Sequence, residues 1–203
     1  REENYRYRDF VIIARDMAPY EEAIINACQK NEVACFIDRR RPLAEYPTAI
    51  SILSAFNVVL NFSTENILRF CKCGLDIFTT EEMSKLENYV NIWNINGNQW
   101  LKEWTMNPNG FNTESSDSEA EELEIINALR RRVINPLMQF KNNFNGNAKQ
   151  RAMAVYELLK IFNATQAFMQ LSEIYSSLGE LAQVDALRQS WDMLAKVFDD
   201  LSD

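Results

Sequence analysis

An uninterrupted apolar run near the start of the chain limits its possible folds more than any other feature. Residues 10–14, Phe-Val-Ile-Ile-Ala, are rich in β-branched side chains and lie between charged residues. Such a run is typical of a strand that is buried on both faces inside a parallel sheet. Asp16 and Pro19 then mark a helix start, and after Asn31 a second apolar run occupies residues 33–37. Strand, helix and strand in this order predict a β-α-β unit with parallel strands.

The predicted β-α-β unit is too small to be a complete sheet. Two parallel strands alone are not stable, and no further strand pattern follows in the chain. We therefore expect residues 1–45 to be the edge piece of an α/β domain whose other strands are missing, and the chain to be a fragment of a larger protein. A first residue that is Arg rather than Met agrees with an excised or processed chain. The orphaned strand edge would also allow the fragment to self-associate.

Residues 46–203 have the pattern of a helical domain. Their apolar residues recur at spacings of three and four, the period of an amphipathic helix with one buried face. The five glycines and five prolines also favour helices over a turn-rich sandwich or barrel. The fold class we predict is therefore mainly α, with a helical domain preceded by the small β-α-β unit. The expected helices cover about 47–61, 64–73, 80–96, 119–142, 148–162, 164–178 and 180–201.

Two features interrupt this helical pattern. Residues 105–118 are rich in turn formers and small polar residues, and they form the one credible flexible loop. Pro136 lies inside the helix expected at 119–142, and it should kink or divide that helix because proline removes a backbone hydrogen bond and crowds the preceding turn. Just before the loop, Trp100 and Trp104 are four residues apart and are expected to be packing anchors.

The composition argues against a self-contained enzyme. The chain has no histidine, which removes the usual general base, His-dependent nucleophiles and two-His zinc helices. Its five glycines are isolated, so neither a phosphate-binding loop nor a dinucleotide fingerprint is present. Carboxylate pairs such as Glu81-Glu82 lie on polar helical stretches, where a solvated face or a helix N-terminus explains them. We predict no catalytic residue and no metal ligand in this chain.

The four cysteines predict free thiols. Four cysteines in 203 residues do not form the disulfide framework of a small secreted domain. Cys71 and Cys73 have neither a second pair nor a histidine to complete a metal site. Cys28 and Cys35 fall on apolar faces, where we expect them to be buried. The protein is therefore predicted to be reduced and cytoplasmic, and to have no membrane partner, because no stretch approaches the roughly 18 apolar residues of a membrane span.

Positive charge is concentrated in a loop between the two predicted regions. The net charge of −8 makes the surface as a whole unattractive to nucleic acid. Arg39, Arg40 and Arg41 nevertheless form a dense basic cluster in a two-proline loop, which suits contact with a DNA backbone. The alternative is that they pair with Asp38 and Glu45 or pack against missing parts of the parent protein.

A second arginine triplet, residues 130–132, lies on the helix expected at 119–142. Three consecutive helical residues spread over about 200°, so these arginines cannot all face one ligand. We expect them to form an exposed surface, salt-bridged to acidic residues of other helices.

The order Asp9-Phe-Val-Ile-Ile-Ala-Arg15, a helix, and a strand ending in Phe36-Ile-Asp-Arg-Arg-Arg-Pro-Leu-Ala44 resembles the AddB subunit of the bacterial AddAB (RexAB-type) helicase–nuclease. It is more distantly similar to the fourth motif of UvrD-like superfamily 1 helicases. The resemblance extends over most of the chain. It implies that residues 1–45 are an edge piece of a RecA-like helicase domain, and that residues 46–203 are the helical (2B-like) domain inserted into it.

The resemblance also implies a role. AddB acts with an AddA-type motor subunit in double-strand break resection and recombinational repair, and the parent complex uses ATP and Mg²⁺. The family's phosphate-binding loop, nuclease centre and iron–sulfur cysteines match nothing here, so this chain alone is predicted to be inactive. Arg15 aligns with the fourth-motif arginine, which contacts nucleotide in active helicases. The aromatic residue before it is replaced by Ala14, and the alternative for Arg15 is an ion pair with Asp16 or Asp38.

A second function class remains open on the residues alone. A helical protein–protein interaction module without nucleic-acid binding would have the same acidic charge and the same lack of catalytic groups. The resemblance therefore implies that the chain binds DNA or another subunit of its complex, whereas an interaction module would bind another protein.

Overall fold

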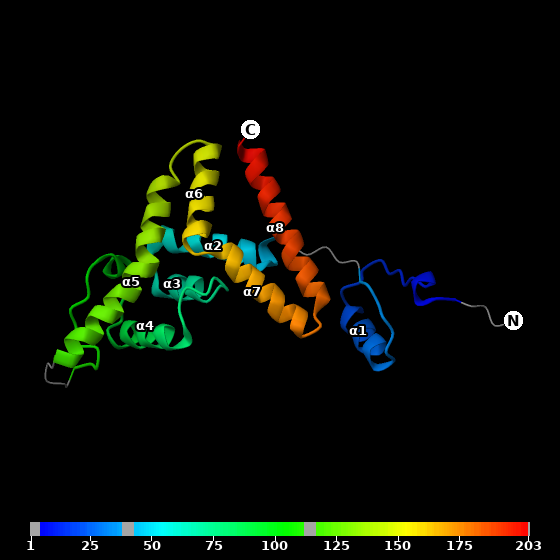
Figure 1. The fold of residues 1–203 in the computed structure, drawn as a ribbon, viewed down its shortest axis with the longest axis horizontal. Coiled ribbons are helices and arrows are strands. Elements are labelled where there is room, and N and C mark those ends of the chain that lie inside the picture. The colour runs from blue at the N-terminus through cyan, green and yellow to red at the C-terminus, as the bar shows by residue number, and fades with distance from the viewer. Residues whose placement is uncertain (1–4, 38–42, 112–116, 203) are drawn as a thin grey trace. The chain divides into compact units, whose positions relative to one another are not determined.

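The computed structural model describes residues 5–37, 43–111 and 117–202, and it divides the chain into two compact units, residues 1–41 and 42–203 (Figure 1). The first unit contains the short 3-10 helix η1 (Tyr7–Asp9) and helix α1 (Glu21–Lys30). A turn precedes α1, in which Asp16 Oδ1 accepts a hydrogen bond of 3.1 Å from the Ala18 amide. Asn31 ends α1 as the sequence predicts, because its side-chain amide donates to the Ala27 carbonyl at 2.7 Å.

The prediction of a β-α-β unit is wrong. In the described part of the chain there are eight α-helices and no β-strand, so only the mainly helical part of the predicted fold class is confirmed. Residues 10–14 and 33–37 flank α1, but neither forms a strand. The physical reason is that a strand needs a partner for its backbone, and two short segments alone do not make a stable sheet. Their apolar side chains remain at the surface.

The second unit is a helical assembly. It contains the 3-10 helices η2 (Leu43–Glu45) and η3 (Gly97–Leu101) and the helices α2 (Pro47–Asn61), α3 (Thr64–Cys71), α4 (Thr80–Ile92), α5 (Asp117–Asn143), α6 (Ala148–Ile161), α7 (Ala164–Ser177) and α8 (Leu181–Ser202). Pro47 is at the first position of α2, where its missing N–H costs nothing. Thr79 and Glu82 form the capping box that starts α4, with hydrogen bonds of 3.2 and 2.9 Å.

Helix α5 contains Pro136 but is not divided by it. The helix runs without interruption from Asp117 to Asn143, so of the two outcomes predicted for this proline the division is wrong. Figure 1 shows that α5 bends along its length. A proline inside a helix is tolerated when neighbouring elements hold the helix in place, and α5 packs against α2, α4 and α6.

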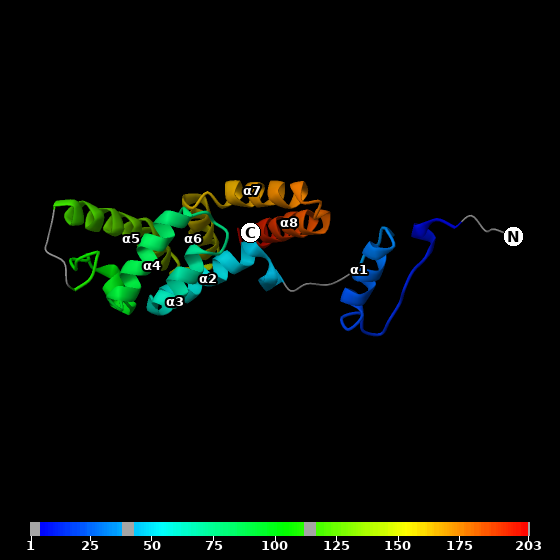
Figure 2. The same cartoon turned by 90° about the horizontal axis from the view of Figure 1, so that it is seen from below.

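Helices α2 and α5 lie at the centre of the second unit. Helix α2 packs against α3, α5 and α8, while α5 also packs against α4 and α6, and α7 packs against α6 and α8. Figure 2 shows the same arrangement from below. Apolar side chains from all of these helices form one core, which is centred on the fully buried residues Val58, Ile67, Phe70, Leu86, Val133 and Leu137.

An aromatic cluster packs the segment 97–111 against α4 and α5. Trp100 and Trp104 are buried and meet edge to face, with ring centroids 5.1 Å apart, so their predicted role as packing anchors is confirmed. Tyr89 of α4 stacks on Trp104 at 4.9 Å. Its hydroxyl donates to the Met106 carbonyl at 3.1 Å. Residues 105–111, the first half of the loop predicted at 105–118, are therefore attached to the core, while residues 112–116 lie outside the described residues.

Candidate functional site

The first candidate site is the surface of the first unit around Arg15. Arg15 follows the apolar run 10–14 and precedes the Asp16 turn, and its side chain is exposed. Among the described residues, no ion pair involves Arg15, and Asp16 is engaged by the Ala18 amide instead. An exposed guanidinium of this kind is available to an anion. The predicted cluster Arg39, Arg40 and Arg41, and the neighbouring Asp38, lie outside the described residues.

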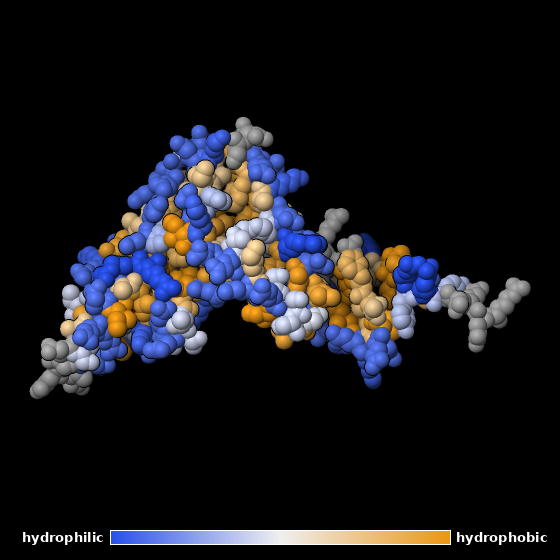
Figure 3. All heavy atoms as spheres, viewed as in Figure 1, coloured by the Kyte–Doolittle hydropathy of each residue, from blue (hydrophilic) through white to orange (hydrophobic). Residues whose placement is uncertain are grey.

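Next to Arg15, the first unit presents a large apolar surface. Residues 10–14, residues 33–37 and the facing side of α1 line a hollow of about 950 Å³. Its side chains are strongly exposed: Ile13 is 85% exposed and Phe36 is 91% exposed. Figure 3 shows apolar surface gathered over α1 and the chain beside it. Each large apolar side chain gains about 1.5–3 kcal/mol when it is buried, so this surface favours contact with another polypeptide.

The second arginine triplet is part of the helical framework rather than a ligand site. Arg131 pairs with Glu124 of its own helix and lies 4.0 Å from Glu103, and Arg132 pairs at 3.1 Å with Glu82 of α4. The predicted ion pair with another helix is confirmed for Arg132, whereas the near partner of Arg131 is on its own helix, so for Arg131 the predicted location of the partner is wrong.

For Arg130 the predicted exposure is wrong, because this side chain is only 6% exposed. It donates to the Trp100 carbonyl at 2.9 Å and to Asn127 Oδ1 at 3.2 Å. Burial lowers the pKa of its guanidinium, and the neighbouring Arg131 lowers it further. Arg130 therefore holds the aromatic segment 97–104 against α5 and is not available to a ligand.

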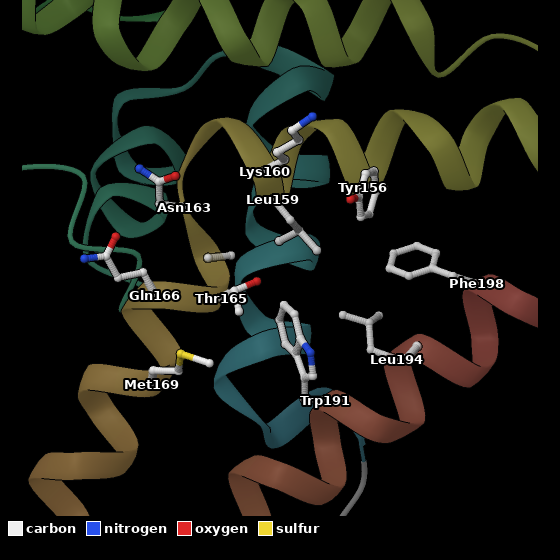
Figure 4. A pocket seen from close by; sticks show the side chains of 12 residues that line it. Tyr156, Leu159, Lys160, Asn163, Thr165, Gln166, Met169, Trp191, Leu194 and Phe198 are labelled. Atoms are coloured by element: carbon white, nitrogen blue, oxygen red, sulfur yellow. The ribbon is translucent and has the colours of Figure 1, made fainter.

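Sequence reasoning missed a groove between α6, α7 and α8. The groove has a volume of about 490 Å³, and Figure 4 shows Trp191, Leu194 and Phe198 of α8 facing Tyr156 and Leu159 of α6. A polar rim is formed by Lys160, Asn163 and Gln166. The spacing of apolar residues in α8 indicated that one face of the helix packs into the core. It did not indicate that part of this face lines a groove. The distinction depends on the angle at which α8 leaves α6, which no local pattern encodes.

The α6–α7–α8 groove suits binding rather than acid–base chemistry. Lys160 is the one charged side chain among its described lining residues. The Trp191 ring packs against Phe168, with ring centroids 5.5 Å apart. Aromatic anchors with a polar rim are the usual composition of a site for an apolar side chain of a partner.

Two kinds of site are absent from the residues that the structure describes. Within them, no group of three or more His, Cys, Asp or Glu side chains is arranged to hold a metal ion. None of the described helices combines the length and the apolar character that crossing a membrane requires.

Comparison with known proteins gives one consistent result. No protein-family model matches the chain. The chain is 30% identical over 205 residues to the AddB subunit of an ATP-dependent helicase/deoxyribonuclease from Acetivibrio thermocellus, a match that covers 98% of this chain and 18% of the relative. Proteins of the same name match from Clostridium kluyveri, at 29% identity over 210 residues, and from Clostridium botulinum, at 30% over 206 residues. These two matches cover 100% and 99% of this chain, and 18% of each relative.

The chain thus spans less than a fifth of the length of these curated relatives, while nearly all of it takes part in the match. This confirms the resemblance seen in the sequence: the chain is similar, over nearly its whole length, to one segment of the AddB subunits of ATP-dependent helicase/deoxyribonucleases.

Proposed function

We propose that this chain is a non-catalytic part of an AddB-type ATP-dependent helicase/deoxyribonuclease subunit that acts in double-strand break resection and recombinational repair. The observation that carries the proposal is the apolar surface of the first unit, where Ile13 and Phe36 are largely exposed. A chain that matches 18% of its relatives is expected to expose the surface on which the remaining parts would pack. In this proposal residues 1–45 belong to a RecA-like domain and residues 46–203 form the helical domain inserted into it.

The proposed contribution of the chain is contact with DNA or with a motor subunit of the AddA type. Arg39, Arg40 and Arg41 supply three positive charges in succession, and Arg15 supplies an exposed guanidinium without an ion pair in the described residues. In the whole complex, ATP and Mg²⁺ would be used by other segments, and the protein would work in the cytoplasm. Among the residues of this chain we assign nucleotide contact to Arg15 and phosphate-backbone contact to the arginine loop.

Salt-dependent DNA binding tests this proposal. A protein that neutralises about three phosphates of duplex DNA loses affinity with a slope of about −2.7 in log K against log salt, or about 40-fold between about 50 and 200 mM. Fluorescence anisotropy of a labelled duplex would measure this slope for the chain and for Arg39→Glu with Arg41→Glu. We expect the double variant to reduce the slope by about two units and to weaken binding strongly at low salt.

The matched control reverses two exposed arginines of the helical unit. Arg69→Glu with Arg188→Glu makes the same change in net charge, and both residues are in exposed ion pairs that add little to stability. This control should retain the slope of the unmodified chain. Equal losses in both double variants would show that only net charge matters, and absence of binding at low salt would remove the DNA contact from the proposal.

The second candidate function is a helical protein–protein interaction module. The observation that favours it is the α6–α7–α8 groove, which Trp191 lines. In that case binding to a purified motor subunit should be lost in Trp191→Ala and kept in Arg39→Glu with Arg41→Glu. Loss of DNA binding in Arg39→Glu with Arg41→Glu thus supports the first function, and loss of motor-subunit binding in Trp191→Ala supports the second.

A further inference from the structure

The four cysteines lie in two different environments. Cys71 is buried and Cys73 is half-buried in the second unit, and burial raises the pKa of the Cys73 thiol to about 12. Burial likewise raises the pKa of Cys71. In the first unit, Cys28 is half-buried and Cys35 is exposed, so the prediction that these two thiols are buried is wrong. Cys35 is therefore the most accessible of the four thiols to a reagent from solution.

The chain around α1 brings Cys28 and Cys35 together. Cys28 is in the last turns of α1, and Asn31 ends the helix. Glu32 has a φ of +54°, and the Val33 amide donates to the Cys28 carbonyl at 2.9 Å, which turns the chain back along the helix. Residues 33–37 then pass beside α1, and both cysteines line the same apolar hollow. The pKa of the Cys28 thiol is raised first of all by the Cys35 side chain, which agrees with the two thiols lying close together on this hollow.

We propose that Cys28 and Cys35 form an intramolecular disulfide when the protein meets a low-molecular-weight disulfide as oxidant. The exposed Cys35 thiolate attacks one sulfur of the oxidant RSSR, forms a mixed disulfide with it and releases one RS⁻, which takes up the proton that Cys35 lost. The Cys28 thiolate then attacks the Cys35 sulfur and expels the second RS⁻, which takes up the Cys28 proton. In sum, two protein thiols are oxidised to one disulfide and one RSSR is reduced to two RSH.

The order of attack follows from the contacts. The hydrogen bond to Cys35, followed by desolvation, raises the pKa of Cys28, so Cys28 keeps its proton longer than an isolated thiol. Cys35 is also the more exposed of the two. Reaction rate depends on access, and access favours Cys35 as the first nucleophile. The product would fix residues 33–37 to α1 by a covalent bond.

Thiol–disulfide exchange on the full chain tests the proposal. The chain is equilibrated with oxidised and reduced glutathione, quenched with acid, alkylated and digested with trypsin. Cleavage after Arg15, Lys30 and Arg39 places Cys28 and Cys35 in separate peptides, residues 16–30 and 31–39. We expect a linked pair of these two peptides that disappears on reduction, and an intact chain lighter by two hydrogen atoms. Chains that carry glutathione on both cysteines, or dimers linked between chains, would overturn the proposal.

Two controls show that the fold creates the pair. Cys28→Ser should leave Cys35 with one glutathionyl group, and Cys35→Ser should react more slowly than Cys28→Ser because its remaining thiol is less exposed. In the unmodified chain, the equilibrium constant for disulfide formation should be at least about tenfold higher in buffer than in concentrated urea. Equal constants in buffer and urea would mean that the fold does not bring the thiols together, and would refute the proposal.

Discussion

Replacement of Asn127 by alanine tests how the aromatic segment is held to α5. Asn127 is buried, and its side chain bridges the Trp104 backbone: Oδ1 accepts from the Trp104 amide at 3.0 Å and Nδ2 donates to the Trp104 carbonyl at 2.8 Å. Oδ1 also accepts from Arg130 Nε at 3.2 Å. The alanine variant loses all three hydrogen bonds and leaves buried polar groups of Trp104 without a partner.

The expected cost follows from these contacts. Two neutral hydrogen bonds contribute about 1 kcal/mol each and one bond to a charged donor contributes about 1.5–3 kcal/mol, so the loss in free energy of unfolding should be about 3.5–5 kcal/mol. That is a large part of the roughly 5–15 kcal/mol by which a typical domain is stable. Urea titration followed by tryptophan fluorescence measures it directly, because Trp100 and Trp104 are both at the site.

Two further variants make the result interpretable. Asn88→Ala, an exposed asparagine on α4, should change stability by less than about 0.5 kcal/mol. Asn127→Asp should also lower the free energy of unfolding, because it keeps the acceptor for Trp104 and Arg130 but places a second oxygen against the Trp104 carbonyl, where Nδ2 donates in the unmodified chain. If Asn127→Ala costs less than about 1 kcal/mol, the bridge is not a significant support and the argument from buried hydrogen bonds fails at this site.

Three other predictions concern the second unit. Thr48→Val and Ser190→Ala each break the buried Thr48–Ser190 hydrogen bond of 3.0 Å, and each should lower the free energy of unfolding in urea by about 1 kcal/mol. If the double variant loses the sum of the two single losses, the two residues act independently and the contact between them is contradicted. Because burial raises the pKa of Cys73 from 9.0 to about 12, its contribution to stability is complete below pH 9.0 and is lost as pH rises toward 12. The urea midpoint of unfolding should therefore fall over this pH range, and the fall should be smaller in Cys73→Ala. The same dependence on pH in both proteins would show that Cys73 does not cause the fall. Thr79→Ala removes the cap of α4 and should lower the free energy of unfolding by about 1 kcal/mol, while loss of less than about 0.3 kcal/mol would mean that the helix start is fixed by packing alone.

The parts of this fold that could be predicted are those encoded by near neighbours. The Thr79–Glu82 capping box and the Asn31 stop involve residues within four positions, and both occur as the sequence indicates. The β-α-β prediction failed because apolar runs at 10–14 and 33–37 require partner strands, and no local signal supplies them. Pattern alone identified these runs as sheet interior, whereas the structure leaves them at the surface.

The candidate site shows the same division. Arg15 could be named from its place after an apolar run, but only coordinates could show that it makes no ion pair with any of the residues that the structure describes. Arg130 and Arg131 are identical in sequence terms, yet one is buried under Trp100 and the other faces solvent, because helix rotation decides which points inward. The placement of Cys28 and Cys35 on one hollow likewise depends on the turn at Glu32, which the sequence analysis did not identify.

The contact between Thr48 and Ser190 also has a consequence for folding during synthesis. These two residues are 142 positions apart, yet their hydroxyls meet where α2 packs on α8. A ribosome makes α8 well after α2, and a bacterial chain grows at about 5–20 residues per second. For many seconds, one face of α2 thus lacks its final cover, and the second unit cannot complete its core until α8 emerges. Nascent chains stalled before residue 190 should therefore be the ones that chaperones retain.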